Sequence, residues 1–284
     1  MSGGYELVRL KNGTWSVRSV AEGETFHPVV GPVAEAEALY VRQLRLRERA
    51  AEDSGDEWVL WDVGLGAAAN VLTVLRALPN RARTVRVLSF DRTLEPLRFA
   101  AGHAAELGYF EGFQSLVQQL LQEREVSVGA PPFPLHWRVL EADFPTCLQE
   151  PAAVSWPAPH GILFDAFSPA RNPAMWTLPL FTRLHELTRP ERPCALATYS
   201  RATLLRVTLL LAGWFVGVGH ATGEKDETTV AANTPDLIDE PLNGAWLQRA
   251  RRSTSAEPLL ADEYRQQPLS ESNWLALQQH PQFR

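Results

Sequence analysis

The chain has 284 residues, of which 45% are hydrophobic, so it is long enough to bury one large core. No stretch contains the about 18 consecutive apolar residues that a membrane helix needs. The first residues lack the apolar segment of a secretory signal. We therefore expect a cytoplasmic protein without membrane contacts. The net charge of -6 disfavours a nucleic-acid partner, although arginines gather at 42–49, 81–86 and 249–252. Cys147 and Cys194 lack metal-ligand spacing, so we expect both to be buried and reduced, and no metal site.

The predicted elements begin with a short β-rich segment and then alternate between strands and helices. Residues 1–33 contain alternating segments broken by Gly and Pro, and 34–53 has uninterrupted helical periodicity. Beyond them, short apolar runs predict buried strands and longer amphipathic runs predict helices. Strands are expected at 57–64, 84–91, 135–143, 160–167, 194–200, 214–221 and 227–233. Helices are expected at 67–78, 94–107, 113–126, 175–188 and 201–213.

This alternation predicts an α/β fold with a doubly wound, mostly parallel sheet that is covered on both faces. The connection between 214–221 and 227–233 is too short for a parallel crossover, so the last pair should be antiparallel. Such an ending is typical of the class I (Rossmann-like) methyltransferase sheet. We expect an appendage at 1–50, a main domain at 51–234 and a wrapping tail at 235–284. Apolar residues should anchor the tail: Leu237, Leu242, Trp246, Leu259, Tyr264 and Trp274.

The segment DVGLGAAAN (62–70) joins the first buried strand to a helix through glycines. Such a turn brings backbone N–H groups close to a ligand, although a tight turn needs glycine even without one. Ala69 replaces the third glycine of a dinucleotide fingerprint, which favours a ligand made of an adenosine and an amino acid. The candidate cofactor-binding residues here are Asp62, Gly64, Gly66 and Asn70.

Two further carboxylates follow strands at the same edge of the sheet. Asp91 ends the strand 84–91, 25 residues after Gly66, where it could accept both ribose hydroxyls of an adenosine. Asp143 ends the next strand, near the expected place of an adenine. Either side chain could instead cap a helix, and for Asp143 this alternative is the stronger because FPTCL follows it.

The segment FDAFSPARNPAMWT (164–177) is the most specific feature of the sequence. Asp165 ends the fourth strand, and the prolines and Asn172 fix an irregular loop beyond it. A carboxylate in this place can orient an amine and take up its proton. Phe167 and Trp176 could form walls for a flat base. Alternatively, Asp165 only caps the loop, but long ordered loops at strand ends usually have a function.

The same residues, written DAFSPxxNPxMWTxxLF, resemble the methyltransferase domain of the MnmC family, which completes 5-methylaminomethyl-2-thiouridine at the tRNA wobble position. The resemblance extends along most of the chain. It includes GETFHPVVGPVAEAEALYV (23–41), GLGAAAN (64–70), LATYS (196–200), GEKDETTVA (223–231) and HPQF (280–283). The segment HPQF resembles the end of stand-alone members, which lack the FAD oxidase domain.

The resemblance implies an S-adenosyl-L-methionine-dependent N-methyltransferase that converts 5-aminomethyl(-2-thio)uridine to 5-methylaminomethyl(-2-thio)uridine in tRNA. Asp165 would bind the amine, while Gly64, Gly66 and Asp91 would hold the cofactor and Lys225 would lie on the substrate side. The other substrate-side candidates are His27, Phe167, Ser168, Pro169, Asn172 and Trp176. A lone histidine such as His27 is more often structural.

The sequence departs from the family at Ala68, where the family has glycine, and at Asp226, where it has a basic residue. Two alternatives therefore stay open. The acceptor could be a small amine, as the acidic net charge favours, or the chain could be a non-catalytic binding module in which Ala68 closes the cofactor site. If the substrate is tRNA, the arginines of the predicted helix 34–53 should bind phosphates: Arg42, Arg45, Arg47 and Arg49.

Overall fold

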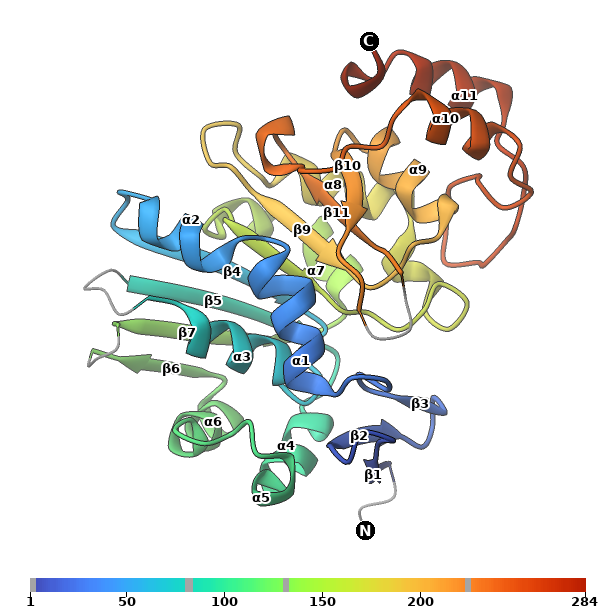
Figure 1. Cartoon of the computed structure of the whole chain (residues 1–284). Helices are drawn as coiled ribbons and strands as arrows, with labels where there is room; N and C mark the ends of the chain where they lie inside the picture. The colour runs from blue at the N-terminus through green and yellow to red at the C-terminus, as the bar shows by residue number, and fades with distance from the viewer. Residues whose placement is uncertain (1–3, 80–83, 130–132, 223–225) are drawn as a thin grey trace.

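The computed structural model describes residues 4–79, 84–129, 133–222 and 226–284. Its centre is an eight-stranded sheet in the order β10-β11-β9-β8-β4-β5-β7-β6 (Figure 1). The strands are β4 (Glu57–Val63), β5 (Thr84–Asp91), β6 (Glu125–Val128), β7 (Leu135–Glu141), β8 (Gly161–Phe164), β9 (Ala195–Thr198), β10 (Phe215–Gly219) and β11 (Thr228–Ala232).

Most neighbouring strands in this sheet are parallel. β4 pairs in parallel with β5 and β8, β5 with β7, and β8 with β9. β11 is antiparallel to both β9 and β10, which confirms the predicted antiparallel end of the sheet. The carboxyl ends of the parallel strands meet at one edge, where Val63 lies beside Phe90 and Phe164.

Helices cover both faces of the sheet because the side chains of each buried strand alternate between two apolar layers. In β4, Trp58 and Leu60 belong to one layer, while Val59 and Trp61 belong to the other. The first layer is covered by α1 (Pro32–Ala36), the π-helical η1 (Glu37–Arg42), α2 (Leu46–Glu52), α3 (Ala69–Ala77), α4 (Glu95–Gly102), α5 (Ala104–Leu107) and α6 (Gln114–Glu123). The second is covered by α7 (Phe144–Gln149), α8 (Leu178–Glu186), α9 (Thr203–Leu211), α10 (Gly244–Arg251) and α11 (Glu271–Gln278). Four 3-10 turns complete the chain: η2 (Pro151–Ser155), η3 (Pro173–Trp176), η4 (Pro235–Leu237) and η5 (Pro281–Phe283).

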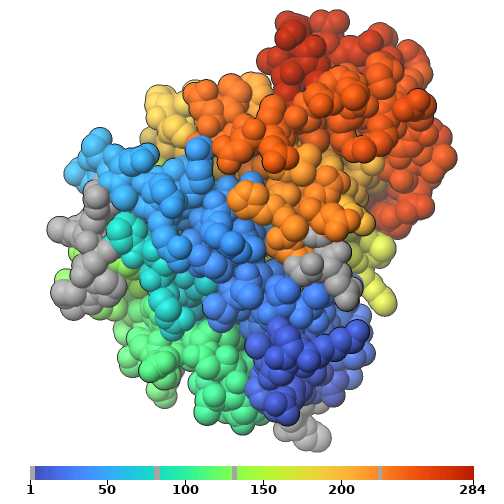
Figure 2. Space-filling model, in the orientation of Figure 1, coloured from blue at the N-terminus to red at the C-terminus, as the bar shows by residue number. Residues whose placement is uncertain are grey.

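A separate antiparallel sheet forms the amino-terminal part of the chain, as the alternating residues at 1–33 predict. It consists of β1 (Tyr5–Arg9), β2 (Trp15–Ser19) and β3 (Glu24–Thr25). The ring of Tyr5 lies 6.2 Å from that of Phe99 on α4. In the space-filling view the small sheet, in dark blue, lies against the green segment that follows α4 in the chain (Figure 2).

The tail after β11 packs over the second layer, as predicted. Leu242, Trp246 and Leu259 are buried there, and Trp274 packs against the same cluster. Side-chain oxygens of Asn243 and Ser270 cap the two tail helices, α10 and α11. Leu237 is partly buried against the first layer. The prediction was wrong for Tyr264, which is 38% exposed.

Three helices differ from their predicted spans. The predicted helix 34–53 is interrupted at Arg45, whose left-handed backbone (φ 49°) separates η1 from α2. The predicted helix 94–107 is broken at His103, between α4 and α5. The predicted helix 113–126 ends at Glu123, because Arg124 (φ 65°) turns the chain into the unpredicted strand β6. Left-handed backbone is uncommon outside glycine, so the composition gives no signal for the turns at Arg45 and Arg124.

Both cysteines are buried and unpaired, as their spacing predicts.

Within the part of the chain that the structure describes, no helix combines the length and the apolar character that crossing a bilayer requires.

Candidate active site

A cavity of about 550 Å³ opens at the carboxyl edge of the parallel strands. The turns after β4, β5, β7 and β8 form one side, and the loop from β3 to α1 forms another. Open α/β sheets bind ligands at this edge. The cavity brings together these sequence-predicted residues: His27, Gly64, Gly66, Asn70, Asp91, Asp143, Asp165, Phe167 and Asn172.

Two glycines in the turn after β4 hold three strand ends together. A Cβ added to Gly64 would lie 2.5 Å from the carbonyl oxygen of Asp165, and the backbone of Gly64 has φ 92°. Only glycine permits that approach and that conformation. The N–H of Gly66 donates to Asp91 Oδ2 at 2.8 Å. The turn therefore fixes the ends of β5 and β8 relative to β4.

Asp91 is a largely buried carboxylate that lines the cavity beside Gly66. Burial raises its pKa, although hydrogen bonds from the backbone of Gly66, Thr93 and Arg92 oppose that shift. The next carboxylate, Asp143, accepts from the hydroxyl of Thr146 at 2.8 Å and caps α7. The capping alternative is thus observed for Asp143, which also lines the cavity.

Asp165 follows β8 and is held by side chains from distant segments. The amide of Asn70, in the first turn of α3, donates to Asp165 Oδ2 at 2.7 Å. His27 Nε2 lies 3.8 Å from the same oxygen, and Glu35 Oε1 lies 3.6 Å from His27 Nδ1. Asn70, which we predicted to contact the cofactor, thus contacts Asp165 through its amide nitrogen and also lines the cavity. Sequence reasoning did not single out Glu35, which lies within the family-like segment 23–41, because seven residues separate it from His27.

The loop after Asp165 contributes less to the cavity than predicted. Phe167 lines it and lies 6.0 Å from the ring of Phe26. Trp176 is fully buried, and its Nε1 donates to the carbonyl of Phe167 at 2.8 Å, so it supports the loop and is no wall of the cavity. Ser168 donates to Glu24 at 3.3 Å, but it does not line the cavity, and neither does Pro169. Lys225 lies outside the described residues.

Asp62 lies beneath the site and does not line the cavity. Its carboxylate is buried within the sheet and accepts from the hydroxyl of Ser89 at 2.7 Å. Burial raises the pKa of Asp62 to about 7, against the lowering effect of that hydrogen bond. Because Asp62 shares the face of Leu60 on β4, its side chain points into the first apolar layer and away from the ligand edge.

Most of the arginines at 42–49, predicted to bind phosphates, have partners within the protein. Arg49 donates to the carbonyls of His160 and Pro193, both at 2.8 Å, so it is a structural residue. Arg47 pairs with Glu37 at 2.9 Å, and Arg45 lies 3.7 Å from Asp239. The break at Arg45 and these internal partners leave Arg42 as the exposed member of the row without an ion pair to a described residue.

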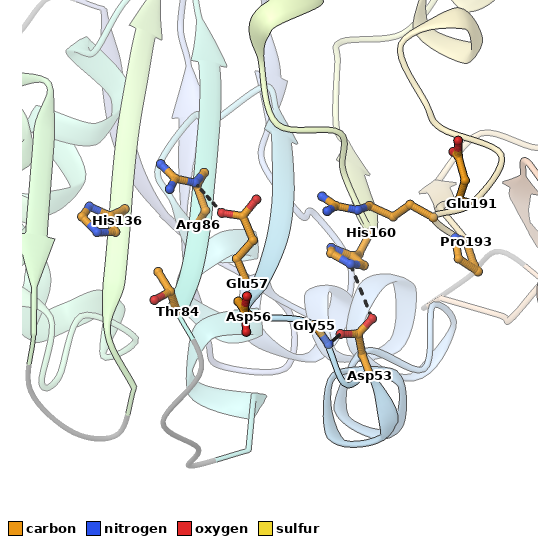
Figure 3. A pocket seen from close by; sticks show the side chains of 11 residues that line it. Asp53, Gly55, Asp56, Glu57, Thr84, Arg86, His136, His160, Glu191 and Pro193 are labelled. Atoms are coloured by element: carbon orange, nitrogen blue, oxygen red, sulfur yellow. Dashed lines mark hydrogen bonds and ion pairs between the residues drawn. The ribbon is translucent and has the colours of Figure 1, made fainter.

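A second hollow of about 550 Å³ lies at the opposite, amino-terminal edge of the strands. Figure 3 shows Glu57 directed at Arg86 and His160 directed at Asp53, with distances of 3.1 and 3.6 Å. Ligands of this fold class bind at the other edge, so the candidate active site is the cavity around Asp91 and Asp165.

Comparison with known proteins relates the chain to methyltransferases. Residues 138–234 match the family model described as S-adenosyl-L-methionine-dependent methyltransferase. The tRNA 5-methylaminomethyl-2-thiouridine biosynthesis bifunctional protein MnmC of Methylibium petroleiphilum is 28% identical over 250 residues, 84% of this chain and 36% of the relative. The protein of the same name from Aeromonas hydrophila is 28% identical over 226 residues, 72% of this chain and 32% of the relative. The chain thus spans about a third of the length of these relatives.

Two solved structures share the fold. MnmC2 from Aquifex aeolicus superposes with a TM-score of 0.68 at 23% identity, covering 97% of this chain and 84% of that one. A spermidine synthase in complex with the transition state analogue AdoDATO gives 0.51 at 9% identity, covering 96% and 79%. These matches, together with the sheet order and the sequence relatives, confirm the predicted fold and resemblance: the chain is homologous to the methyltransferase region of the MnmC proteins and has their Rossmann-like methyltransferase fold.

Proposed function

We propose that this protein is a cytoplasmic S-adenosyl-L-methionine-dependent N-methyltransferase that methylates the aminomethyl nitrogen of a tRNA wobble uridine. One observation carries the proposal: the turn at Gly64 and Gly66 brings the carboxylates of Asp91 and Asp165 into one cavity. A carboxylate after the second parallel strand suits a ribose, and one beside the acceptor suits an amine. The relatives named for tRNA 5-methylaminomethyl-2-thiouridine biosynthesis support this acceptor.

The residues around Gly66 fit the cofactor. Asp91 faces the cavity while its oxygens are held by backbone N–H groups of Gly66 and Thr93. The buried Oδ1 of Asn70 has no hydrogen-bond partner among the described residues, so it can accept from a ligand ammonium. Ala68 is fully buried and is not part of the cavity lining, so it does not close the site, which disfavours the non-catalytic alternative. When bound, the cofactor supplies a methyl group attached to a positively charged sulfur.

The charge of the cavity favours cationic ligands. The described lining includes one arginine, Arg92, and six carboxylates: Glu22, Glu24, Glu35, Asp91, Asp143 and Asp165. A concave surface of one sign concentrates ligands of the opposite sign. An ammonium is therefore attracted into the cavity, whereas the phosphates of a polynucleotide should remain outside it.

Asp165 has the position to prepare an amine for methylation. The acceptor nitrogen can form the new N–C bond only with a free lone pair, so an ammonium must first lose one proton. The Asp165 carboxylate can accept a hydrogen bond from the nitrogen and take up that proton. Because Asn70 fixes Oδ2 at 2.7 Å, the carboxylate is held in one orientation towards the acceptor.

Phosphate contacts with tRNA must lie beyond the acidic cavity, and we propose Arg171 and Arg201 for them. Both are exposed, and each follows a strand whose carboxyl end faces the cavity. Arg171 precedes Asn172 and Arg201 follows Tyr199 by two residues, and both of those neighbours line the cavity. This replaces the arginine row at 42–49 as the expected phosphate-binding surface.

We expect isothermal titration to show that S-adenosyl-L-methionine binds and that Asp91→Ala weakens binding by about 1–3 kcal/mol, since the ribose hydroxyls lose their acceptor. Glu95→Ala is the matched control, because Glu95 is an exposed acid four residues further on that pairs with Arg98. Absence of binding heat with both the cofactor and its demethylated product would contradict the proposed cofactor.

We expect methyl transfer to purified tRNA carrying 5-aminomethyluridine, detected by nucleoside mass spectrometry, to fall steeply with salt. The slope should increase by about one unit for each phosphate contacted, because bound counterions are released. The double variant R171E/R201E should mimic high salt, whereas R42E/R47E should behave like the wild type. Equal, salt-insensitive activity on the free nucleoside would instead identify a small-amine methyltransferase.

A further inference from the structure

The imidazole of His27 lies between two carboxylates at the wall of the cavity. Its Nε2 is 3.8 Å from Asp165 Oδ2, and its Nδ1 is 3.6 Å from Glu35 Oε1. The His27 side chain is 8% exposed and that of Glu35 is 13% exposed, so solvent screens these charges weakly. The three groups connect the amino-terminal loop, α1 and the end of β8 in a single chain of alternating charge.

The backbone holds the His27 ring in this place. His27 has a left-handed conformation (φ 50°), which a non-glycine residue adopts at an energetic cost and keeps only when its surroundings enforce it. Before it, the N–H of Phe26 donates to the carbonyl of Val17 at 2.8 Å. After it, Gly31 (φ 89°) approaches Thr14 so closely that an added Cβ would be 2.6 Å from its hydroxyl. Strain that is maintained in this way is common at functional sites.

We propose that His27 and Glu35 are positioning residues for methyl transfer, which act through Asp165 and let the bound amine become neutral at a lower pH. The inference rests on the proposed function of Asp165. An isolated Asp165 carboxylate would hold an ammonium strongly and oppose loss of its proton. A cationic His27 beside Asp165 offsets part of that negative charge, so the ammonium passes its proton through Asp165 to solvent at a lower pH.

The charges around His27 are consistent with its cationic form. Burial alone would lower the pKa of His27, but the interaction with Glu35 and the charge of Asp165 outweigh it and raise the pKa. Other ionisable groups that act on Asp165 or on its neighbours are Glu24 on β3, Tyr40 on η1, Asp62 on β4 and Tyr199 after β9. The pKa of each tyrosine is raised, first by burial and then by the charge of Asp165, so both remain neutral.

The charge pair can be tested without cofactor or acceptor. NMR titration of the histidine ring resonances, with His27→Gln used to assign His27 among the seven histidines, should give His27 a pKa above its ordinary value. Glu35→Gln should lower that pKa, because the partner anion is lost. Glu37→Gln is the matched control, since Glu37 lies two residues on and pairs with Arg47. If the His27 titration curve of Glu35→Gln overlays that of the wild type, the charge pair does not exist.

The effect on catalysis is tested by the pH dependence of kcat. His27→Gln should move the acidic limb to higher pH, and a move of about one unit means a tenfold loss of kcat on the rising part of the curve. The value of kcat at high pH should approach that of the wild type, and KM for the acceptor should not increase. His136→Gln, on the exposed side of β7, should leave the profile unchanged.

A uniform loss of kcat at every pH with a raised KM would show that His27 only supports the loop, and would overturn the inference. Failure of the wild type to methylate the uridine amine would contradict the proposed function instead, while the NMR titration would still decide whether the charge pair exists. The two failures are therefore distinguishable.

Discussion

Replacing Asp165 by asparagine should reduce turnover by about 10²–10⁴-fold and leave the affinity for the cofactor nearly unchanged. Asparagine has nearly the same shape and can still accept from the amide of Asn70, which is 2.7 Å from Asp165 Oδ2 in the wild type. It cannot take up a proton, and it removes the negative charge that attracts an ammonium. The loss should therefore appear in methyl transfer.

Single-turnover methyl transfer and isothermal titration with the cofactor would measure the two effects separately. Asp91→Asn provides the opposite control, because Asp91 lies beside Gly66 at the cofactor side. It should weaken the cofactor more than it slows transfer from the saturated complex. Equal losses of cofactor affinity and turnover in Asp165→Asn would show that Asp165 serves the cofactor and not the amine.

Replacing Asp62 by asparagine should make stability much less dependent on pH. The pKa of Asp62 is raised by burial from 3.8 to about 7. Below about pH 4 the carboxyl is protonated in both the folded and the unfolded chain. Between pH 4 and 7 the unfolded chain releases the proton while the folded chain keeps it, so the wild type loses stability as the pH rises. With about 1.36 kcal/mol per unit, this loss amounts to roughly 4 kcal/mol.

Urea denaturation from pH 4 to pH 8 would measure this difference. The free energy of unfolding of Asp62→Asn, relative to the wild type, should increase with pH over that range and level off above pH 7. Asp56→Asn is a suitable control, because Asp56 is exposed just before β4 and should reproduce the wild-type profile. Parallel pH profiles for Asp62→Asn and the wild type would mean that Asp62 is ionised at little cost in the fold.

The sequence predicted the elements that local patterns encode. Asp91 and Asp165 could be placed at one edge because each ends a buried strand, and parallel strands align their carboxyl ends. The hydrogen bond from Asn70 to Asp165 could not be predicted, because the two residues are 95 positions apart.

Glu35 and Trp176 show two further limits. Glu35 matters to the site because it lies beside His27. The left-handed backbone that orients His27 cannot be recognised from the composition. Trp176 was predicted as a wall because aromatic rings often stack on bases, but it is buried in the core and its indole N–H donates to the carbonyl of Phe167. The turns at Arg45 and Arg124 were missed because they too depend on left-handed backbone at a residue other than glycine.

The small amino-terminal sheet has a practical consequence for handling the protein. Gly4 and Tyr5 are part of the cavity lining, so anything fused just before them would lie at the mouth of the active site. Strand β1 and helix α11 lie at opposite ends of the molecule (Figure 1). A purification tag or a fluorescent label attached after α11 should therefore leave substrate access intact, whereas the same group attached before β1 should obstruct it.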